Sequence, residues 1–446
     1  MAKSDAPNSQ EQAKAPGEEH RFVQRGEQPT IPDMTVQTYA NQAGALAARG
    51  QEAVPELVRL TFETAVNVQA SDVHFDPFRD GLCVRFRVGG VLHHLVDLPK
   101  PLAMNVVRHC QNLARLLTHR SSLPQEGYIR REALDMPYNF RMATYPTYWG
   151  ECASIRIFGA EPELRKIDEL GFPDHVTQAL HDSLVLQDGL ILLSGPAGSG
   201  KTTTLYAALH HIVEESKATR RVATIEDPVE NVIDGVMQTE VNRRVNLDFE
   251  RALRSILRHD VGVIMVGEIR DTETAMNAVE ASLTGHLVLS TVHAGRAYTV
   301  PYRLLEMGVP PYALSGGIQL VIAERLVREL REERSRPLTE EESSWLPQAA
   351  REGARTVNGK KYSPITAYAG RFALAEKLAT SEDLRRAIME QATLSRFREI
   401  ASQEGEDLPG QALRAVREGR TTWREVLRVL AGERGLEHGR VIEPAR

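Results

Sequence analysis

The sequence predicts an α/β protein in which a parallel sheet forms the main domain and a smaller α+β domain precedes it. Short apolar runs alternate with helical stretches at 190–193, 222–225, 263–266 and 287–291. Short, fully apolar strands separated by helices are typical of a parallel sheet that is buried on both faces. Upstream, a period-two run at 82–88 lies between stretches of helical spacing, which indicates a mixed domain of strands and helices.

Composition sets broad limits. The 446 residues correspond to about two to four domains. The net charge of −6 disfavours a protein that coats nucleic acid. Three distant cysteines, Cys83, Cys110 and Cys152, exclude a disulfide scaffold and any Cys-x-x-Cys metal knuckle. Because we find neither an apolar run of about 18 residues nor an apolar leader near Met1, we expect a cytoplasmic protein.

The N-terminal part divides into a tail and a small domain. Residues 1–35 are polar and proline-containing, so we expect a disordered tail, with order beginning near Ala53. The domain itself is assigned to 36–158. It is expected to contain a helix from Pro55 to Val66, a hairpin 82–95 that turns at Gly89-Gly90, a helix 101–118, and strands 139–145 and 153–158.

Three further segments complete the chain. Pro162, Gly171 and Pro173 interrupt the pattern and indicate a linker at 159–173. The main α/β domain is assigned to 174–330. Residues 331–446 are expected to form a charged surface insertion, extending to about residue 363, and then a helical region rich in Arg and Glu.

A phosphate-binding motif follows the first apolar strand of the main domain. The run from Gly195 to Thr202 fits G-x-x-x-x-G-K-[ST] between a predicted strand and a predicted helix. Glycines let backbone N–H groups turn toward one phosphate, Lys201 adds a positive charge, and a Thr hydroxyl is a ligand for Mg²⁺. We therefore prefer nucleotide binding to an idle glycine-rich turn. The predicted nucleotide-binding residues are Gly195, Pro196, Ala197, Gly198, Ser199, Gly200, Lys201, Thr202 and Thr203.

Acidic residues follow two other strands. Glu226, Asp227 and Glu230 come after the strand at 222–225, and Glu268 comes after 263–266. Ligands bind beyond the carboxyl ends of strands in open α/β sheets. One carboxylate can hold the water shell of Mg²⁺ while another polarises the attacking water. The alternative is that these acids are solvated or cap the next helix.

Histidines flank the last apolar strand. His286 and His293 are separated by ~23 Å in an extended chain, so both cannot touch one phosphate unless the chain bends. The residues alone favour a structural role for each of them.

Two pairs of arginines are further candidates. Arg141 and Arg156 alternate with apolar residues on predicted strands, and Arg254 and Arg258 share one side of a helix. Composition alone favours solvated surface groups at all four positions.

Several longer motifs resemble those of the secretion ATPases, the hexameric motors of type II secretion, type IV pili and type IV conjugative secretion. The segments that carry the resemblance are Asp227 to Glu230, Val266 to Ala275, Leu283 to His293, and, nearer the N-terminus, Ala70 to His74 and Val84 to Arg87. The resemblance extends over about residues 50 to 430.

This resemblance implies a PAS-like N-terminal domain, a RecA-like P-loop ATPase core and a ring of six chains with ATP at the interfaces. Glu268 is then the catalytic carboxylate, with Glu226 beside it, and Thr202 and Glu268 hold Mg²⁺, in part through water. His293, with His286 second, joins the catalytic set. So do Arg141, Arg156, Arg254 and Arg258, which in the family approach the nucleotide's phosphates.

The sequence also departs from the family pattern. No cysteine follows Cys152, so the C-terminal zinc site of many assembly motors is absent and we expect ATP and Mg²⁺ but no zinc. Asp260-Val261-Gly262 and Ala294-Gly295-Arg296 replace more common family sequences, and the sequence leaves open whether Arg296 alters phosphate sensing.

The resemblance implies an ATPase that powers assembly of a type IV pilus, a conjugative pilus or a secretion apparatus. Its expected location is the cytoplasmic face of the inner membrane, bound peripherally to a platform protein, without direct nucleic-acid binding. The alternatives are a pilus-retraction motor, a RecA-fold DNA motor, and a scaffold that binds nucleotide without hydrolysing it.

Overall fold

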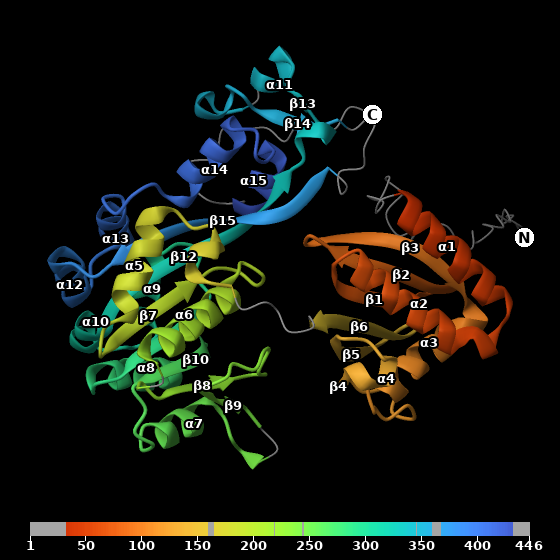
Figure 1. The fold of residues 1–446 in the computed structure, drawn as a ribbon, viewed down its shortest axis with the longest axis horizontal. Coiled ribbons are helices and arrows are strands. Elements are labelled where there is room, and N and C mark those ends of the chain that lie inside the picture. Colours follow the sequence, from red (N-terminus) through yellow and green to blue (C-terminus); the bar gives the residue numbers. More distant parts are fainter. Residues whose placement is uncertain are drawn as a thin grey trace, which may run out of the picture.

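The computed structural model describes residues 33–158, 165–217, 219–242, 245–344, 346–358 and 367–430. They form two bodies, each built on its own β-sheet, which lie side by side in Figure 1. Within these ranges, no helix has both the length and the apolar character needed to cross a lipid bilayer.

The N-terminal body is an antiparallel sheet with helices packed on one face. Its strands follow the order β3-β2-β1-β6-β5-β4. The strands are Ala70–Phe78 (β1), Gly81–Val88 (β2), Val91–Pro99 (β3), Gln125–Ile129 (β4), Asn139–Thr147 (β5) and Gly150–Phe158 (β6). The helices are Asp33–Ala48 (α1), Gln51–Ala53 (η1), Val54–Asn67 (α2), Lys100–Leu113 (α3) and Arg131–Leu134 (α4). Alternate residues such as Phe75 and Phe86 point into the core beneath the helices, which leaves the other face of the sheet polar.

The start of this body differs from the expectation. The predicted helix and hairpin are present as α2 and β2–β3, but the expectation that order begins near Ala53 is wrong. Helix α1 places Tyr39, Ala43 and Leu46 in the core, and its first residues, 33–35, were assigned to the disordered tail 1–35. Residues 1–32 of that tail lie outside the described residues. Large apolar side chains are few in this segment and alanines make up much of the rest, so its helical pattern is weak in the sequence.

The second body is built on a seven-stranded sheet in the order β15-β12-β7-β11-β10-β8-β9. Every neighbouring pair is parallel except β12 and β15. The strands are Gly189–Ser194 (β7), Val222–Glu226 (β8), Val236–Glu240 (β9), Val263–Ile269 (β10), Leu287–Val292 (β11), Ile318–Leu330 (β12) and Tyr368–Ala379 (β15). The four apolar runs identified in the sequence are therefore the central strands.

Helices cover both faces of this sheet. Successive residues of β7 point to opposite faces, so Leu190 and Leu192 join one core and Ile191 and Leu193 join another. The helices are Ile167–Leu170 (η2), Asp174–Leu184 (α5), Lys201–Ser216 (α6), Phe249–Ile256 (α7), Thr272–Leu283 (α8), Thr299–Glu306 (α9) and Pro311–Gly317 (α10). This burial on two sides explains why the strands are continuously apolar.

The C-terminal region continues the second body. The insertion between β12 and β15 carries a small ribbon, and four helices follow β15. These elements are Glu332–Arg334 (η4), Ser335–Pro337 (β13), Glu340–Ser344 (α11), Gln348–Ala350 (η5), Arg355–Val357 (β14), Glu382–Met389 (α12), Leu394–Ala401 (α13), Leu408–Arg417 (α14) and Trp423–Leu430 (α15). Trp423 and Val426 are buried in the same core as the central strands.

Two expected boundaries need correction. The main domain does not end at 330, because β15 is the antiparallel edge strand of its sheet. The expected linker 159–173 is also too long. Ile167 and Phe172 are buried in the core beneath α6, so residues 165–173 belong to the second body; residues 159–164 lie outside the described residues.

Helix α1 provides a stability test. Tyr39 is 1% exposed, its hydroxyl lies 2.9 Å from Thr61 Oγ1, and its ring lies 6.1 Å from that of Phe86. Tyr39→Ala should destabilise the N-terminal body by about 3–5 kcal/mol, because it leaves a cavity, while Tyr39→Phe should cost about 1 kcal/mol. Hydrogen–deuterium exchange should then accelerate in α1 and β2 and stay unchanged in α6. Unchanged exchange in α1 would contradict the packing described here.

Candidate active site

The predicted phosphate loop lies between β7 and α6, at the carboxyl edge of the sheet. Gly195, Gly198 and Gly200 have φ angles of +152°, +75° and +113°, which side-chain-bearing residues rarely adopt. A Cβ on Gly195 would lie 2.4 Å from Ser199 Oγ and 2.7 Å from the carbonyl oxygen of Glu324. The loop is therefore folded so tightly that glycine is required. Since α6 begins directly after it, the positive end of a helix dipole faces the loop.

Lys201 lies inside this loop. Its ammonium group donates hydrogen bonds to the carbonyl oxygens of Gly195 at 2.9 Å and Pro196 at 2.8 Å. Burial lowers the pKa of Lys201, and the nearby carboxyls of Glu324 and Glu268 oppose that shift. A negatively charged group bound in the loop would therefore stabilise the positive charge of this buried ammonium group.

Three threonines follow Lys201 and differ in their surroundings. Thr202 is half-buried and Thr203 is exposed, whereas Thr204 is buried and its hydroxyl donates to Glu324 Oε2 at 2.8 Å. Glu324 comes from β12 and is 1% exposed, and its Oε1 has no hydrogen-bond partner. Burial raises the pKa of Glu324 to about 7. Sequence reasoning missed Glu324, although an acidic residue within an apolar strand is a signal that could have identified it.

Glu268 lies close to the loop, at the end of β10. Its carboxylate forms an ion pair with Arg270, and its Oε2 lies 3.4 Å from Nε2 of His293. The charge of Glu268 also acts on Lys201. The structure therefore brings together the loop lysine, the predicted catalytic carboxylate and one of the two predicted histidines.

Side chains of β11 hold the end of β10 in place. Ser290 Oγ donates to the carbonyl of Val266 at 2.7 Å, and Thr291 Oγ1 donates to that of Gly267 at 2.8 Å. The ladder between the two strands is irregular at this point. Buried hydroxyls thus satisfy carbonyls that the ladder leaves free, and they fix the backbone that carries Glu268.

The structure separates the two histidines. Strands β11 and β7 pair in parallel from Leu287 with Gly189 to Val292 with Ser194. His293 therefore lies beside the phosphate loop, while His286 lies at the opposite edge of the sheet, where its Nδ1 is 3.2 Å from the carbonyl oxygen of Ala281. The catalytic assignment of His286 is corrected, because the full length of the strand lies between it and the loop.

Glu226 also differs from the expectation. It is 4% exposed, and its carboxylate accepts hydrogen bonds from Tyr206 Oη at 2.5 Å, Thr224 Oγ1 at 2.5 Å and Gln238 Nε2 at 3.1 Å. A carboxylate engaged by three donors in the interior is not placed to polarise a water molecule. Glu226 instead joins α6, β8 and β9, so we reassign it as a positioning residue. Sequence reasoning did not find Tyr206 or Gln238, because these partners lie on α6 and β9 and no local pattern links them to Glu226.

Arg141 and Arg156 are cross-strand neighbours on β5 and β6, as expected, on the polar face of the N-terminal sheet. Arg141 pairs with Glu126 at 2.7 Å and Arg156 with Asp72 at 3.0 Å. Their charges also reach the second body, where Arg141 interacts with Asp227 and Arg156 with Glu230. Both arginines thus face the loop after β8 rather than the phosphate loop of the same chain.

Arg254 and Arg258 lie on and just after α7. Arg254 pairs with Glu250 at 2.8 Å, and Arg258 donates to the carbonyl oxygen of Arg254 at 2.9 Å. Both side chains are exposed. Glu250 and Glu268 line the same cavity of about 230 Å³ beside α7. The structure therefore brings α7 near the predicted catalytic carboxylate but leaves these two arginines on the surface.

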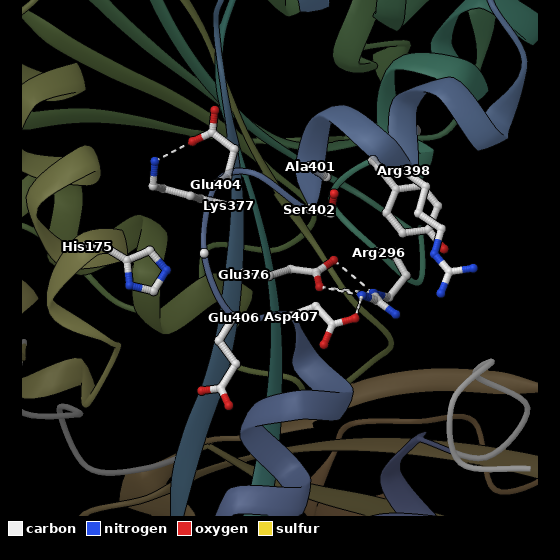
Figure 2. Close-up of a pocket in the computed structure, with 12 residues that line it drawn as sticks. His175, Arg296, Glu376, Lys377, Arg398, Ala401, Ser402, Glu404, Glu406 and Asp407 are labelled. Atoms are coloured by element: carbon white, nitrogen blue, oxygen red, sulfur yellow. Dashed lines mark hydrogen bonds and ion pairs between the residues drawn. The ribbon is translucent and has the colours of Figure 1, made fainter.

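Arg296 points away from the phosphate loop, toward β15 and the start of α14. Figure 2 shows its guanidinium directed at Glu376 and Asp407, at 2.8 and 2.9 Å. These groups line a cavity of about 330 Å³, whose wall also carries the pair formed by Lys377 and Glu404. Arg296 therefore anchors the segment after His293 to β15 and α14.

Comparisons with known proteins place the chain in a family. The family model described as "Type II/IV secretion system protein" matches residues 47–428. The chain is 37% identical over 380 residues to the "Putative type II secretion system protein E" of Escherichia coli K12, covering 84% of this chain and 76% of the relative. It is 38% identical over 387 residues to the type II secretion system protein E of Xanthomonas campestris, covering 84% of this chain and 67% of that relative. It is 35% identical over 384 residues to the "Type IV pilus assembly ATPase PilB" of Thermus thermophilus, covering 84% of this chain but 43% of the relative.

Solved structures support the same fold. The Legionella pneumophila ATPase DotB superposes with a TM-score of 0.61 at 22% identity, covering 82% of this chain and 93% of DotB. The pilus retraction motor PilT with bound ADP superposes with a TM-score of 0.56 at 24% identity, covering 84% of this chain and 97% of PilT. The fold and site define a P-loop ATPase of the secretion and pilus class, which confirms the predicted fold class. The chain belongs to the type II/IV secretion system protein family.

The Glu226 network predicts a stability defect. The Tyr206 hydroxyl donates to Glu226 and accepts the backbone N–H groups of Glu230 and Asn231 at 3.1 and 3.2 Å. Tyr206→Phe should destabilise the second body by about 1–3 kcal/mol, because it leaves these polar groups without a partner. Thermal unfolding measures the loss. Tyr302→Phe, which removes a hydroxyl from the surface of α9, is the control, and an equal effect of the two substitutions would contradict the network.

Glu324 predicts a pH-dependent stability difference. Its pKa is about 7 in the folded chain against 4.5 for an ordinary glutamate, so the folded state loses stability as pH rises from about 4.5 to 7. Glu324→Gln removes this penalty and should stabilise the protein at pH 8 by about 2–3 kcal/mol, but not at pH 4.5. Thermal unfolding at both pH values measures it, with the exposed Glu332→Gln as control. A gain that is equal at both pH values would contradict the assignment.

Proposed function

We propose that this chain hydrolyses Mg²⁺·ATP as a subunit of a hexameric motor that powers assembly of a type IV pilus, a conjugative pilus or a secretion apparatus. One observation carries the proposal: the ammonium group of Lys201 in a tightly folded phosphate loop lies within electrostatic reach of the Glu268 carboxylate. Membership of the secretion family and similarity to proteins named as ATPases support the same reaction.

The residues of the site fit a triphosphate and a magnesium ion. The glycine-lined loop has no room for a Cβ at Gly195, and Lys201 is held by two carbonyls that a phosphate group can replace. Thr202 and Glu268 supply the oxygen ligands that Mg²⁺ prefers, in part through water. The ion would neutralise charge on the phosphates when bound.

Glu268 has the catalytic role in this proposal. It is only partly exposed, and Arg270 and His293 hold its carboxylate at the edge of the sheet. From there it orients and polarises the water that attacks the terminal phosphate. His293, fixed at the end of β11 beside the loop, is placed to respond when that phosphate leaves.

The arginines couple hydrolysis to movement in this proposal. Arg141 and Arg156 lie on the N-terminal body, and Arg254 and Arg258 are exposed near α7. In a ring of six chains, these arginines can reach the phosphates bound by a neighbouring subunit. Their attraction falls when the terminal phosphate is released, so the bodies that carry them shift.

The choice of apparatus rests on the relatives. The relatives with 35–38% identity are type II secretion proteins E and a pilus assembly ATPase. They favour a motor that drives assembly of the pilus or secretion apparatus, at a platform protein on the cytoplasmic face of the inner membrane. A retraction motor is the second candidate, with support only from the shared fold of PilT. The net charge of −6 disfavours a DNA motor.

Glu268→Gln tests the proposal. The amide cannot polarise water, so phosphate release should fall at least ~100-fold while nucleotide affinity changes little. Phosphate release and fluorescent-nucleotide titration measure the two quantities. Glu280→Gln, at an exposed position on α8, is the matched control.

Retained turnover in Glu268→Gln would refute the catalytic assignment. In cells, the same variant should lose filaments or secreted cargo if the motor drives assembly. An excess of filaments would instead identify a retraction motor.

A further inference from the structure

Three side chains with metal-binding chemistry converge on the hairpin formed by β2 and β3. The Cys83 sulfur, a ring nitrogen of His94 and a carboxylate oxygen of Asp97 all lie within 4.8 Å of one another. Cys83 and His94 are half-buried, and Asp97 is exposed. This cluster lies on the N-terminal body, apart from the phosphate loop, and the proposed ATPase activity makes no use of it.

An irregularity in the hairpin creates the convergence. Cys83 is paired with Asp97, and Val84 with Val96, but Arg85 is paired with His94, so Leu95 is an extra residue on β3. In a regular strand, positions 94 and 97 would point to opposite faces of the sheet. The β-bulge at Leu95 shifts the alternation by one residue and turns His94 to the face that carries Cys83 and Asp97.

Polar contacts already join the three groups. His94 Nε2 lies 2.8 Å from Asp97 Oδ1, and the Cys83 thiol is hydrogen-bonded to the Asp97 carboxyl group. Because the three ligand atoms lie this close together on one face of the hairpin, the geometry favours a shared cation.

We propose that Cys83, His94 and Asp97 bind one zinc ion, with water in the fourth position. Thiolate, imidazole and carboxylate are the three ligand types that zinc takes from proteins, and a three-ligand site leaves one position open. The thiolate and the carboxylate together balance the charge of a divalent ion. Arg85, whose charge acts on Cys83, forms an ion pair with Asp76 at 2.8 Å, which reduces its repulsion of a bound metal.

The position of the hairpin gives the site a structural consequence. Its turn at Gly89-Gly90 lies against the second body, because Cβ atoms at these glycines would approach Arg328 at 3.3 Å and Arg428 at 3.6 Å. A metal that joins the two strands stiffens the element that makes this contact. This zinc site differs from a Cys-x-x-Cys knuckle, which the sequence excludes.

The test uses the full chain, free of affinity tag and nucleotide, after treatment with a chelator. Dialysis against zinc followed by metal analysis should find about one zinc ion per chain, and Cys83→Ser should reduce it to near zero. Cobalt in place of zinc should give a thiolate-to-metal absorption band that the same substitution removes. Cys152→Ser, which changes a half-buried cysteine outside the cluster, should retain both signals.

Two results would overturn the proposal. One is a wild-type chain that binds no zinc and shows no thiolate-to-cobalt band, which does not depend on how the variants fold. The other is a Cys83→Ser chain that binds zinc as wild type does, which would move the metal to other residues. His94→Asn and Asp97→Asn should each weaken binding, and zinc should slow amide exchange in β2 and β3 of the wild-type chain.

Discussion

The chemistry of this protein depends on the parallel register of β7, β11, β10 and β8. Ser194 is level with Val292, and Val266 is level with both Ser290 and Ile225, so the four strands end at one edge of the sheet. The phosphate loop and His293 follow these ends, and Glu226 and Glu268 lie in the last residues of their strands. Each is separated from the others by many residues of chain, so only hydrogen bonding between strands brings them together. If the register shifted by one residue, the side chains at these ends would point to the other face.

Two buried carboxyl groups, those of Glu226 and Glu324, differ in how many hydrogen bonds they receive. Glu226 receives three hydrogen bonds, and removing any donor leaves part of a buried charge unpaired. Glu324 receives one, from Thr204, and one of its oxygens has no partner. Desolvation then raises its pKa, even though Lys201 and Arg325 lie close enough to oppose the shift. The first arrangement holds elements together, while the second leaves the underside of the phosphate loop sensitive to pH.

Charged contacts also connect the active-site edge to the rest of the molecule. Arg156 and Arg141 link the N-terminal sheet electrostatically to the loop after β8. Arg296 joins the segment after β11 to β15 and α14 through Glu376 and Asp407, as Figure 2 shows. Because these interactions attach to the loops that flank the phosphate site, a displacement of either loop would act on both the N-terminal body and the C-terminal helices.

The sequence by itself determined the phosphate loop, the central strands and the α/β class, because these depend on local patterns: a glycine-rich motif and short apolar runs. It also predicted Lys201 and Glu268 as site residues, and the family resemblance added His293. Tertiary structure decided the rest. The sequence analysis placed β15 in a helical region, whereas the structure pairs it with β12. Glu226 is buried because Tyr206 and Gln238 pack against it. The direction of β11 sets the position of His286. The β-bulge at Leu95 brings His94 to the face that carries Cys83. Pairing between distant segments sets each of these outcomes, and a local pattern carries no information about which segments will meet.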